Sequence, residues 1–426
     1  MSVILSHPTG NTFVRAALRA LRTGNELDTF YTTISASPRV ARWLPASVRR
    51  QFMRRWFSEA PASLIRMRPA RELIRLFGSA LDLRFLTRPG AWASVDAVYE
   101  HFDRHVARRI RSLPADATVS AVYCYEDAAE HTFLEARARQ FACIYELPIA
   151  YWETTQRLLR EEADRMPAWR VTLGGIDDPP EKLDRKAREM ESADTVVVPS
   201  RFVLDSLPQH ILREKNCVLA PFGSPWPLRA GATRDECQSG KLRVLFAGSM
   251  SQRKGLGDLF AAMRLLDRTD VELVVMGSLL APIAFYRSQY PGFHYEAPRP
   301  HSQVLSLMQS CDVLVLPAIV EGRALVQHEA LASGLPLIIT PNSGGDDLVE
   351  EGRTGFLVPI RSPEAIAERL AWFADHRQLL PEMRRLALKK AGETGWARYE
   401  LQVREAALQA VRRLEPRVPA EAAAPC

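Results

Sequence analysis

The sequence predicts an α/β protein with two doubly wound, Rossmann-like domains. A chain of 426 residues is too long for one ordinary core and suits two. Short apolar runs alternate with helical stretches in both halves, which is the order of a parallel sheet covered by helices. Residues 222–240 are rich in Pro, Gly and Ser and lack periodicity, so they form a linker. The predicted domains are residues 1–221 and 241–395, and a last helix with a tail occupies residues 396–426.

Composition limits the class of protein. Hydrophobic residues make up 47% and charged residues 25%, as in ordinary soluble domains. No apolar run approaches the roughly 18 residues of a membrane-spanning helix, and the N-terminus is unlike a secretory signal. The nine histidines and six cysteines show no metal-ligand spacing, so we expect reduced thiols, a cytoplasmic location, no cofactor and no metal. The cysteines are Cys124, Cys143, Cys217, Cys237, Cys311 and Cys426.

Apolar runs in the first half predict strands over residues 3–6, 27–33, 119–125, 143–145, 194–200 and 216–221. Gly10 lets the loop after the first strand turn tightly and approach a ligand, although an ordinary strand–helix turn has the same appearance. Acids follow two later strands, with Glu126 beside Asp127 and Glu146 at the end of 143–145. They lie at the carboxyl ends of strands, where such sheets bind ligands. The alternative is that Glu126 and Glu146 cap neighbouring helices.

Positive charge is concentrated in the first domain. From Arg39 to Arg75 there are ten arginines against two acids, Glu59 and Glu72, which gives a local charge of +8. Because the whole chain has a net charge of +6, the rest of the chain carries −2. Residues 42–57 have an amphipathic helical pattern, with Arg49, Arg50, Arg54 and Arg55 between the apolar positions. Such a helix can lie on an anionic membrane, bind acidic ligands or simply expose a solvated face. No nucleic-acid-binding motif accompanies it, so we expect no nucleic-acid partner.

The second half predicts strands over residues 242–248, 271–277, 293–297, 312–318 and 337–340. Helices are predicted to begin near residues 256 and 324 and to occupy residues 363–374 and 379–391. The helix near residue 324 opens at the carboxyl edge of the sheet. The backbone N–H groups of Arg323, Ala324 and Leu325 after Gly322 would therefore face an anion, which the helix dipole favours.

Charged residues frame two helix starts at this edge. Glu321 and Glu329 flank the helix near residue 324, and ionised carboxylates accept hydrogen bonds from sugar hydroxyls. Arg253 and Lys254 precede Gly255 at the other helix start and suit a diphosphate. The alternatives are a surface acid beside an ordinary helix-face acid, and a solvated pair of cations.

Longer motifs surround these residues. The strings LRVLFAGSMSQRKGLGDLFAAM, EGRALVQHEALASGLPLIITPNSGG and EEGRTGFLVP resemble the retaining glycosyltransferases of family 4, over about residues 194–371. The resemblance implies a GT-B arrangement of two domains facing across a cleft. It also implies metal-independent transfer of a sugar from a nucleotide-sugar to an acceptor glycan, lipid or small molecule. A non-catalytic nucleotide-sugar-binding protein of the same fold is the alternative. Peripheral membrane contact through residues 39–75, at the inner membrane face, is a further expectation.

The same resemblance implies roles for individual residues. Gly10 and Asn11 would face the donor diphosphate, Arg253 and Lys254 would stabilise the leaving group, Glu321 would hold the donor sugar and Glu329 the ribose. Glu146 stands where the family often has a histidine facing the donor sugar, so it would act in catalysis as a general base or as a second acid that binds the acceptor. Ser249 replaces a family arginine, so one diphosphate cation is missing or its charge is supplied by Arg253 or Arg323. The helix from Trp396 would cross back onto the first domain.

Overall fold

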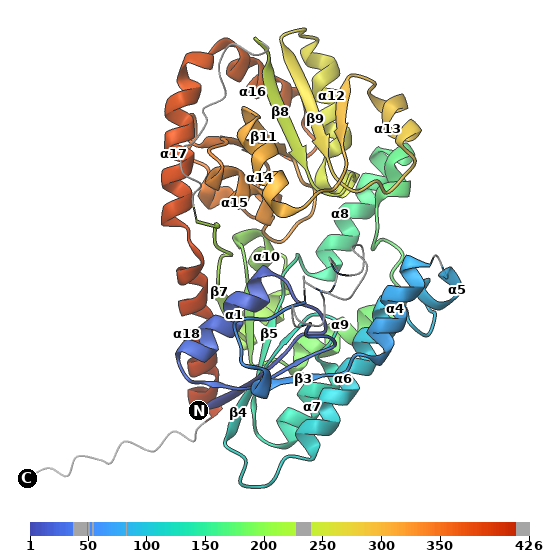
Figure 1. Cartoon of the computed structure of the whole chain (residues 1–426), viewed down its shortest axis with the longest axis vertical. Coiled ribbons are helices and arrows are strands. Elements are labelled where there is room, and N and C mark those ends of the chain that lie inside the picture. The colour runs from blue at the N-terminus through green and yellow to red at the C-terminus, as the bar shows by residue number, and fades with distance from the viewer. Residues whose placement is uncertain (37–48, 50–51, 53–54, 82, 227–239, 415–426) are drawn as a thin grey trace, which may run out of the picture.

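The computed structural model describes residues 1–36, 49, 52, 55–81, 83–226 and 240–414. Figure 1 shows two α/β domains stacked along the long axis, with helices α17 and α18 running down one side of both. The predicted pair of doubly wound domains is thus confirmed. Most of the predicted helix over residues 42–57, including Arg50 and Arg54, lies outside the described residues, as do Cys237 and Cys426.

The first domain is built on a seven-stranded parallel sheet in the order β3-β2-β1-β4-β5-β6-β7. The order reverses beside β1, which creates the crevice where such sheets bind ligands. The strands are β1 (Ser2–Ser6), β2 (Leu27–Thr32), β3 (Ile65–Met67), β4 (Val119–Tyr125), β5 (Ala142–Glu146), β6 (Thr195–Val198) and β7 (Asn216–Leu219). β3 was not predicted, because its three residues are too few and too exposed to show an apolar pattern.

Helices cover both faces of this sheet. They are α1 (Thr12–Thr23), α4 (Ala70–Ala80), α5 (Arg84–Thr87), α6 (Val95–Arg111), α7 (Glu130–Ala138), α8 (Trp152–Arg165), α9 (Pro180–Ser192), α10 (Arg201–Asp205) and α11 (Gln209–Glu214). α1 illustrates why they form here, since Asn11 caps its start by accepting from the Val14 N–H at 3.0 Å. Its apolar face, with Val14 and Leu18, is completely buried against the strands.

The second domain holds a six-stranded parallel sheet in the order β10-β9-β8-β11-β12-β13. Its strands are β8 (Leu242–Ala247), β9 (Val271–Met276), β10 (Phe293–Glu296), β11 (Val313–Leu316), β12 (Leu337–Ile339) and β13 (Gly355–Leu357). Its helices are α12 (Leu256–Leu266), α13 (Ile283–Gln289), α14 (His301–Gln309), α15 (Leu325–Ala332), α16 (Pro363–Asp375) and α17 (Leu380–Glu393). The central strands are buried on both faces, as their continuous apolar sequences require.

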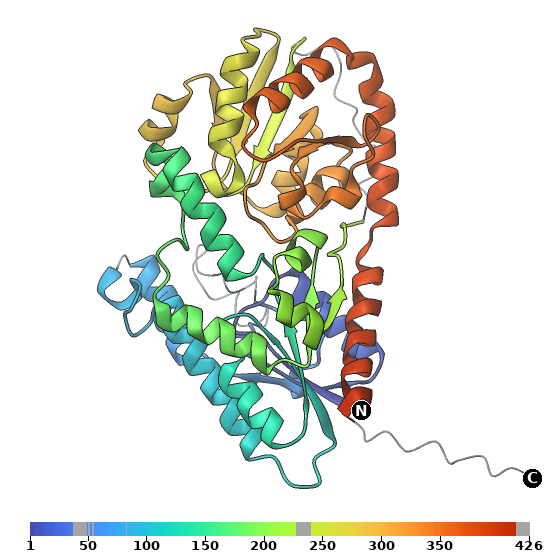
Figure 2. The same ribbon diagram turned by 180° about the vertical axis from the view of Figure 1, so that it is seen from behind.

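Two stretches of chain cross between the domains side by side. Ser224 donates its N–H to the Thr394 carbonyl at 2.7 Å and pairs with Gly395 as a parallel bridge. A Cβ on Gly223 would overlap the backbone of Trp396, so only glycine lets the strands approach this closely. After this crossing α18 (Trp396–Leu414) runs along the first domain (Figure 2). Its residue Tyr399 is completely buried there.

α8 leaves the first sheet and packs on the second domain with the short helix that follows it (Pro167–Thr172). Trp169 is 1% exposed, and its ring centroid lies 5.8 Å from that of Phe260 and 5.9 Å from that of Tyr286. The predicted boundary at residue 221 therefore separates the two sheets but not the two packed cores.

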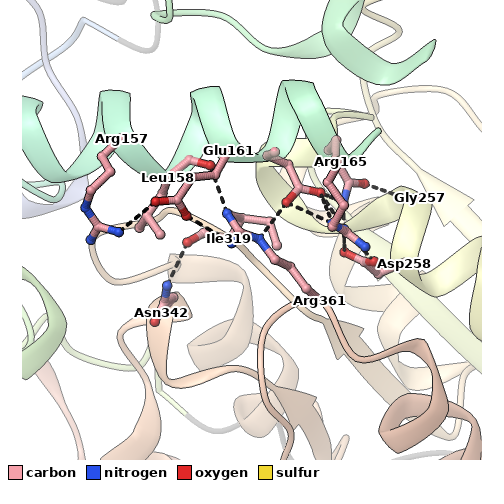
Figure 3. A network of polar contacts seen from close by, with 11 residues as sticks. Arg157, Leu158, Glu161, Arg165, Gly257, Asp258, Ile319, Asn342 and Arg361 are labelled. Atoms are coloured by element: carbon pink, nitrogen blue, oxygen red, sulfur yellow. Dashed lines mark hydrogen bonds and ion pairs between the residues drawn. The ribbon is translucent and has the colours of Figure 1, made fainter. Parts of the chain in front are cut away.

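Buried carboxylates join α8 to the second domain. Glu162 accepts from Gln252 Nε2 at 2.8 Å and from Arg361 Nε at 2.8 Å. Arg165 donates to Asp258 at 2.7 Å, and Figure 3 shows Arg165, Asp258 and Arg361 meeting where α8 crosses the second domain. A buried carboxylate without such partners would cost several kcal/mol. The pairs therefore favour one position of α8 against the second domain.

Candidate functional site

Glu321, Arg253 and Lys254 meet at the carboxyl edge of the second sheet. The Nζ of Lys254 lies 2.6 Å from Glu321 Oε2, and an Arg253 guanidinium nitrogen lies 3.7 Å from the same oxygen. The cations follow β8 and the glutamate follows β11, which are neighbouring parallel strands. The structure thus brings Glu321 beside two adjacent cations, although Glu321 follows Lys254 by 67 positions in the sequence.

The turn between the cations and α12 depends on Gly255. Its φ of 74° lies in the left-handed region, and a Cβ there would overlap the Pro317 carbonyl oxygen after β11. The close approach is reinforced where the Ile319 N–H donates to the Arg253 carbonyl at 2.9 Å. Backbone contact between the two loops therefore holds Lys254 beside Glu321.

Electrostatics keep Glu321 ionised. Burial by itself would raise the pKa of Glu321, but Lys254 and Arg253 outweigh burial and hold its pKa below the ordinary value. An ionised carboxylate only accepts hydrogen bonds. The cluster thus presents two cations that suit phosphate oxygens beside a carboxylate that suits hydroxyl groups.

Gly322, which follows Glu321 in the chain, contacts the first domain. A Cβ on Gly322 would overlap the Pro148 carbonyl oxygen, just after β5, and Ser200 Oγ donates to the Gly322 carbonyl at 2.6 Å. The loop that follows Glu321 therefore touches the carboxyl edge of the first sheet. Its tight fit accounts for the glycine, and the expected contact of Gly322 with a donor remains a prediction.

Arg323 has a different position from the one expected. Its side chain is 4% exposed and donates to Asp347 at 2.6 and 3.1 Å, to the Gly344 carbonyl at 2.8 Å and to the Phe222 carbonyl at 3.2 Å. These acceptors occupy both ends of the guanidinium fork. The expectation that Arg323 supplies the missing diphosphate charge is therefore wrong, and Arg253 remains the candidate.

His328 is hydrogen-bonded both to Arg323 and to Ser224, which lies at the crossing between the domains. Arg323 Nε lies 2.9 Å from His328 Nε2, and His328 Nδ1 lies 2.9 Å from Ser224 Oγ. Burial, and then the Arg323 charge, lowers the pKa of His328 well below its ordinary value, so the ring is neutral. Since Nε2 accepts from Arg323, Nδ1 carries the proton and donates to Ser224. Ser224 Oγ lies a further 2.9 Å from Thr394 Oγ1.

The backbone at the start of α15 offers fewer donors than expected. The Ala324 N–H donates to the Ser343 carbonyl at 3.1 Å, so the expectation that it faces an anion is wrong. Leu325 is the first residue of α15, and its N–H is among those that a helix leaves without an intrahelical acceptor. The anion-binding role predicted for the N–H groups of Arg323 and Leu325 remains a prediction.

Glu329 has a partner that the sequence did not suggest. Its Oε1 lies 2.9 Å from Nε2 of His301, and this hydrogen bond raises the pKa of His301. His301 begins α14 directly after the loop of residues 298–300. The contact brings that loop to the acid expected to hold the ribose.

Glu146 was expected to face the site, but the structure encloses its side chain. It is 1% exposed beneath α18, where its oxygens accept from Tyr123 at 2.6 Å and from Tyr399 at 2.9 Å. Burial raises the pKa of Glu146 to about 7, although these hydrogen bonds oppose the rise. The helix-capping alternative is also wrong. Glu126 pairs with Lys186 at 2.8 Å, and the first-turn N–H groups of His131 and Thr132 in α7 donate to Asp103 instead.

The loop after β1 shows local reasons for its residues. A Cβ on Gly10 would overlap the Phe57 ring, and Asn11 is the cap of α1. Their contact with a donor diphosphate remains a prediction. The sequence analysis missed His7, which is 7% exposed at the end of β1 with its ring 4.6 Å from that of Tyr125. Burial lowers the pKa of His7 to about 4, so a neutral imidazole stands at this edge. Its position directly after an apolar strand was the available signal.

Two surface cavities lie away from the cluster. One cavity of about 420 Å³ adjoins α1, and another of about 390 Å³ lies along α8. Neither cavity is lined by Glu321 or Lys254. Across the described residues, no group of three or more His, Cys, Asp or Glu side chains is placed to hold a metal ion. A search of that same part of the chain also yields no helix with the length and apolarity that crossing a bilayer demands.

Comparison with known proteins finds a family match within the second domain and curated relatives that match part of the chain. Residues 241–376 match the family described as "Glycosyl transferases group 1". The "Putative colanic acid biosynthesis glycosyltransferase WcaL" of Escherichia coli K12 is 29% identical over 182 residues, which are 38% of this chain and 42% of that protein. The "D-inositol 3-phosphate glycosyltransferase" of Paenarthrobacter aurescens is 30% identical over 166 residues, 36% of this chain and 41% of that protein. The chain thus matches about two fifths of these curated relatives.

Solved structures resemble the whole chain in fold. A sucrose-phosphate synthase from Thermosynechococcus elongatus aligns with a TM-score of 0.67 and 15% identity, covering 97% of this chain and 100% of that one. The Anabaena protein HepE in complex with UDP aligns with a TM-score of 0.61 and 12% identity, covering 96% and 100%. Together these matches identify residues 241–376 as a group 1 glycosyltransferase domain within a chain that has the GT-B fold of two facing Rossmann-like domains.

Proposed function

We propose that this protein is a family 4 glycosyltransferase that moves a sugar from a nucleoside-diphosphate donor to an acceptor hydroxyl, with retention of configuration. The contact of Lys254 with Glu321 carries the proposal, because a cation of the kind that suits phosphate lies directly beside a carboxylate of the kind that suits hydroxyl groups. The names of the curated relatives support the reaction class. Retention rests on the motifs shared with family 4.

The chemistry follows from the charges at the site. As the bond between the sugar and the diphosphate breaks, negative charge develops on the leaving phosphate. Lys254, Arg253 and the N-terminus of α15 can stabilise that charge in place, so we propose that transfer requires no metal ion. Glu321 would exchange part of its contact with Lys254 for sugar hydroxyls when the donor enters. The new bond forms between the sugar carbon and the acceptor oxygen, and the proton of the acceptor hydroxyl passes to the departing phosphate oxygen.

Glu329 would hold the other end of the donor. It lies eight positions after Glu321 on α15, and its contact with His301 brings the 298–300 loop beside it. We propose that the ribose hydroxyls bind Glu329 and that the base lies against the loop before His301. The HepE structure contains UDP, so UDP-sugars are the first donors to test.

A non-catalytic nucleotide-sugar-binding protein is the second candidate. Ser249 in place of the family arginine favours it, because one leaving-group cation is absent. Glu146 in place of the family histidine is a second departure, and it is enclosed beneath α18. The two candidates differ in a simple way, because only the enzyme releases a nucleoside diphosphate in the presence of an acceptor.

Donor binding and donor turnover test the proposal together. UDP-, GDP- and ADP-sugars are screened by thermal shift, since a ligand at 100 times its Kd adds about 2.7 kcal/mol to stability. Release of nucleoside diphosphate is then measured for the wild type, for Lys254→Ala and for the control Lys389→Ala, whose exposed lysine lies on α17. We expect Lys254→Ala alone to lose most activity and to bind the diphosphate more weakly.

Two outcomes would reject the proposal. An unchanged kcat/KM in Lys254→Ala would remove the cation from the site. Stabilisation by a nucleotide-sugar without release of diphosphate, across a panel of sugar, glycan and lipid acceptors, would favour the binding protein.

A further inference from the structure

The first domain exposes a dense run of large apolar side chains on α4, α5 and the residues after α5. We call this set the apolar tip: Ile74, Phe77, Leu81, Leu83, Phe85, Trp92 and Val95. Leu81 is 68% exposed, Phe85 66% and Trp92 50%, which is unusual for such side chains when they are clustered. Contiguous apolar surface of this kind marks a contact with another molecule or with a membrane.

Backbone contacts make the apolar tip one surface. The Leu83 N–H donates to the Gly78 carbonyl at 2.7 Å, which folds the chain back after α4. The Ala93 N–H donates to the Leu86 carbonyl at 3.0 Å, which holds Trp92 beside α5. In Figure 1, α4 and α5 project from the first domain on the side away from α17 and α18. The apolar tip is therefore a compact projection.

Arginines border the apolar tip. The guanidinium of Arg71 lies 4.7 Å from the centre of the Trp92 ring, and Arg68 and Arg108 are exposed nearby on the segment before α4 and on α6. No carboxylate of the described residues forms an ion pair with Arg68, Arg71 or Arg108. After the effect of burial, the charges of Arg68, Arg71, Arg104 and Arg108 lower the pKa of His101, which reports a positive field on this side.

The arginines of the basic stretch of residues 39–75 differ in whether an acid compensates their charge. Arg55 and Arg75 both lie 2.6 Å from the completely buried carboxylate of Glu72, so their charges are compensated inside the domain. Arg66 and Arg68 instead are exposed beside α4. Among the described arginines of residues 39–75, Arg68 is thus a cation beside the apolar tip that remains available to an external partner.

We propose that the apolar tip inserts into the surface of an anionic lipid membrane while the bordering arginines contact the lipid headgroups. A projecting apolar surface fits the interfacial layer of a bilayer, where Trp and Phe side chains pack between headgroups. Arginines at its border then meet negative headgroups, and each such cation contributes affinity. A protein partner would need a hollow matched to this projection and lined with acids. The inference is independent of the proposed transferase activity, because membrane binding needs no donor.

Vesicle cosedimentation of the full chain without donor tests the proposal. We expect binding to vesicles of mixed phosphatidylcholine and phosphatidylglycerol, and little binding to phosphatidylcholine alone. The variant Leu81→Ser with Phe85→Ser should lose most binding, because both side chains are exposed and their loss leaves the core intact. The matched control, Leu265→Ser with Leu401→Ser, removes leucines that are 57% and 54% exposed elsewhere and should bind like the wild type.

Charge variants test the arginine border separately. Arg68→Gln with Arg108→Gln should weaken binding by roughly 25-fold, since each cation near an anionic surface contributes about fivefold in affinity. The control Arg412→Gln with Arg413→Gln removes the same charge from the end of α18 and should have a much smaller effect.

Three results would overturn the proposal. These are absent binding to the anionic vesicles at low salt, equal binding by the Leu81/Phe85 variant, and equal loss in the two arginine variants. Light scattering distinguishes a second copy of this chain as the partner. Self-association that only the Leu81/Phe85 variant loses, without vesicle binding, would assign the apolar tip to a dimer interface.

Discussion

Replacing Glu146 by glutamine tests whether this acid is a buried structural group or a member of the site. In the structure Glu146 accepts hydrogen bonds from Tyr123 on β4 and from Tyr399 on α18, and it is 1% exposed. A glutamine of the same shape can accept from one tyrosine and donate to the other. We therefore expect Glu146→Gln to fold and to keep the nucleotide affinity of the wild type.

The pH dependence of stability gives the size of the effect. Folding raises the pKa of Glu146 from 4.5 to about 7, so the folded protein holds this proton more tightly than the unfolded chain. Its contribution to stability is thus fully present below about pH 4.5 and is lost as the pH rises through about 7. At 1.36 kcal/mol for each unit of pKa, the loss is about 3 kcal/mol.

Urea unfolding from about pH 5 to about pH 8 measures this loss. Other groups that titrate in this range contribute equally to the wild type and the variant, so the difference between the two isolates Glu146. Relative to the wild type, Glu146→Gln should gain about 2–3 kcal/mol across the range. The control Glu153→Gln, at an exposed position on α8, should show no such gain.

Either of two results would refute this reasoning. A constant difference in stability across the pH range would mean that Glu146 titrates normally and is hydrated. A folded Glu146→Gln variant with normal donor affinity but a large loss of kcat would return Glu146 to the catalytic site.

The remaining predictions concern the proposed site and the crossing between the domains. Glu321→Gln should mainly lower kcat, because sugar hydroxyls lose their acceptor as charge develops. Glu329→Gln should mainly raise KM, because donor binding loses on the order of 1.5–3 kcal/mol. Wild-type kcat and KM in both variants, measured by donor-saturation kinetics, would contradict the assignment. Transfer should survive EDTA, because the two cations beside Glu321 and the α15 N-terminus already supply positive charge; a loss that Mg²⁺ or Mn²⁺ restores would disprove this. Ser224→Ala should lower the free energy of unfolding by about 1–3 kcal/mol in urea titrations, because it leaves the His328 Nδ1–H without an acceptor. A cost no larger than that of Ser333→Ala, another buried serine, would contradict it.

Local patterns were sufficient for most of the fold. The apolar run over residues 119–125 predicted β4 with its observed bounds, because a strand covered on both faces needs an unbroken apolar sequence. The same reasoning placed Lys254 and Glu321 at one edge, since neighbouring parallel strands end on the same side of a sheet. β3 and β13 were missed, because a strand of three residues is too short to show an apolar pattern.

The sequence by itself thus determined the order of strands and helices, the two-domain fold and the chemical types of residue at the sheet edge. Only the tertiary structure decided which of those residues remain available to a ligand. Arg323 is enclosed by Asp347 and Gly344, and Glu146 by Tyr399, which is 253 positions away. Periodicity depends on neighbours within a few turns of helix or strand, whereas such contacts join segments that are far apart in the chain. The direction of a polar side chain at a domain junction is therefore set by distant partners that its own segment does not specify.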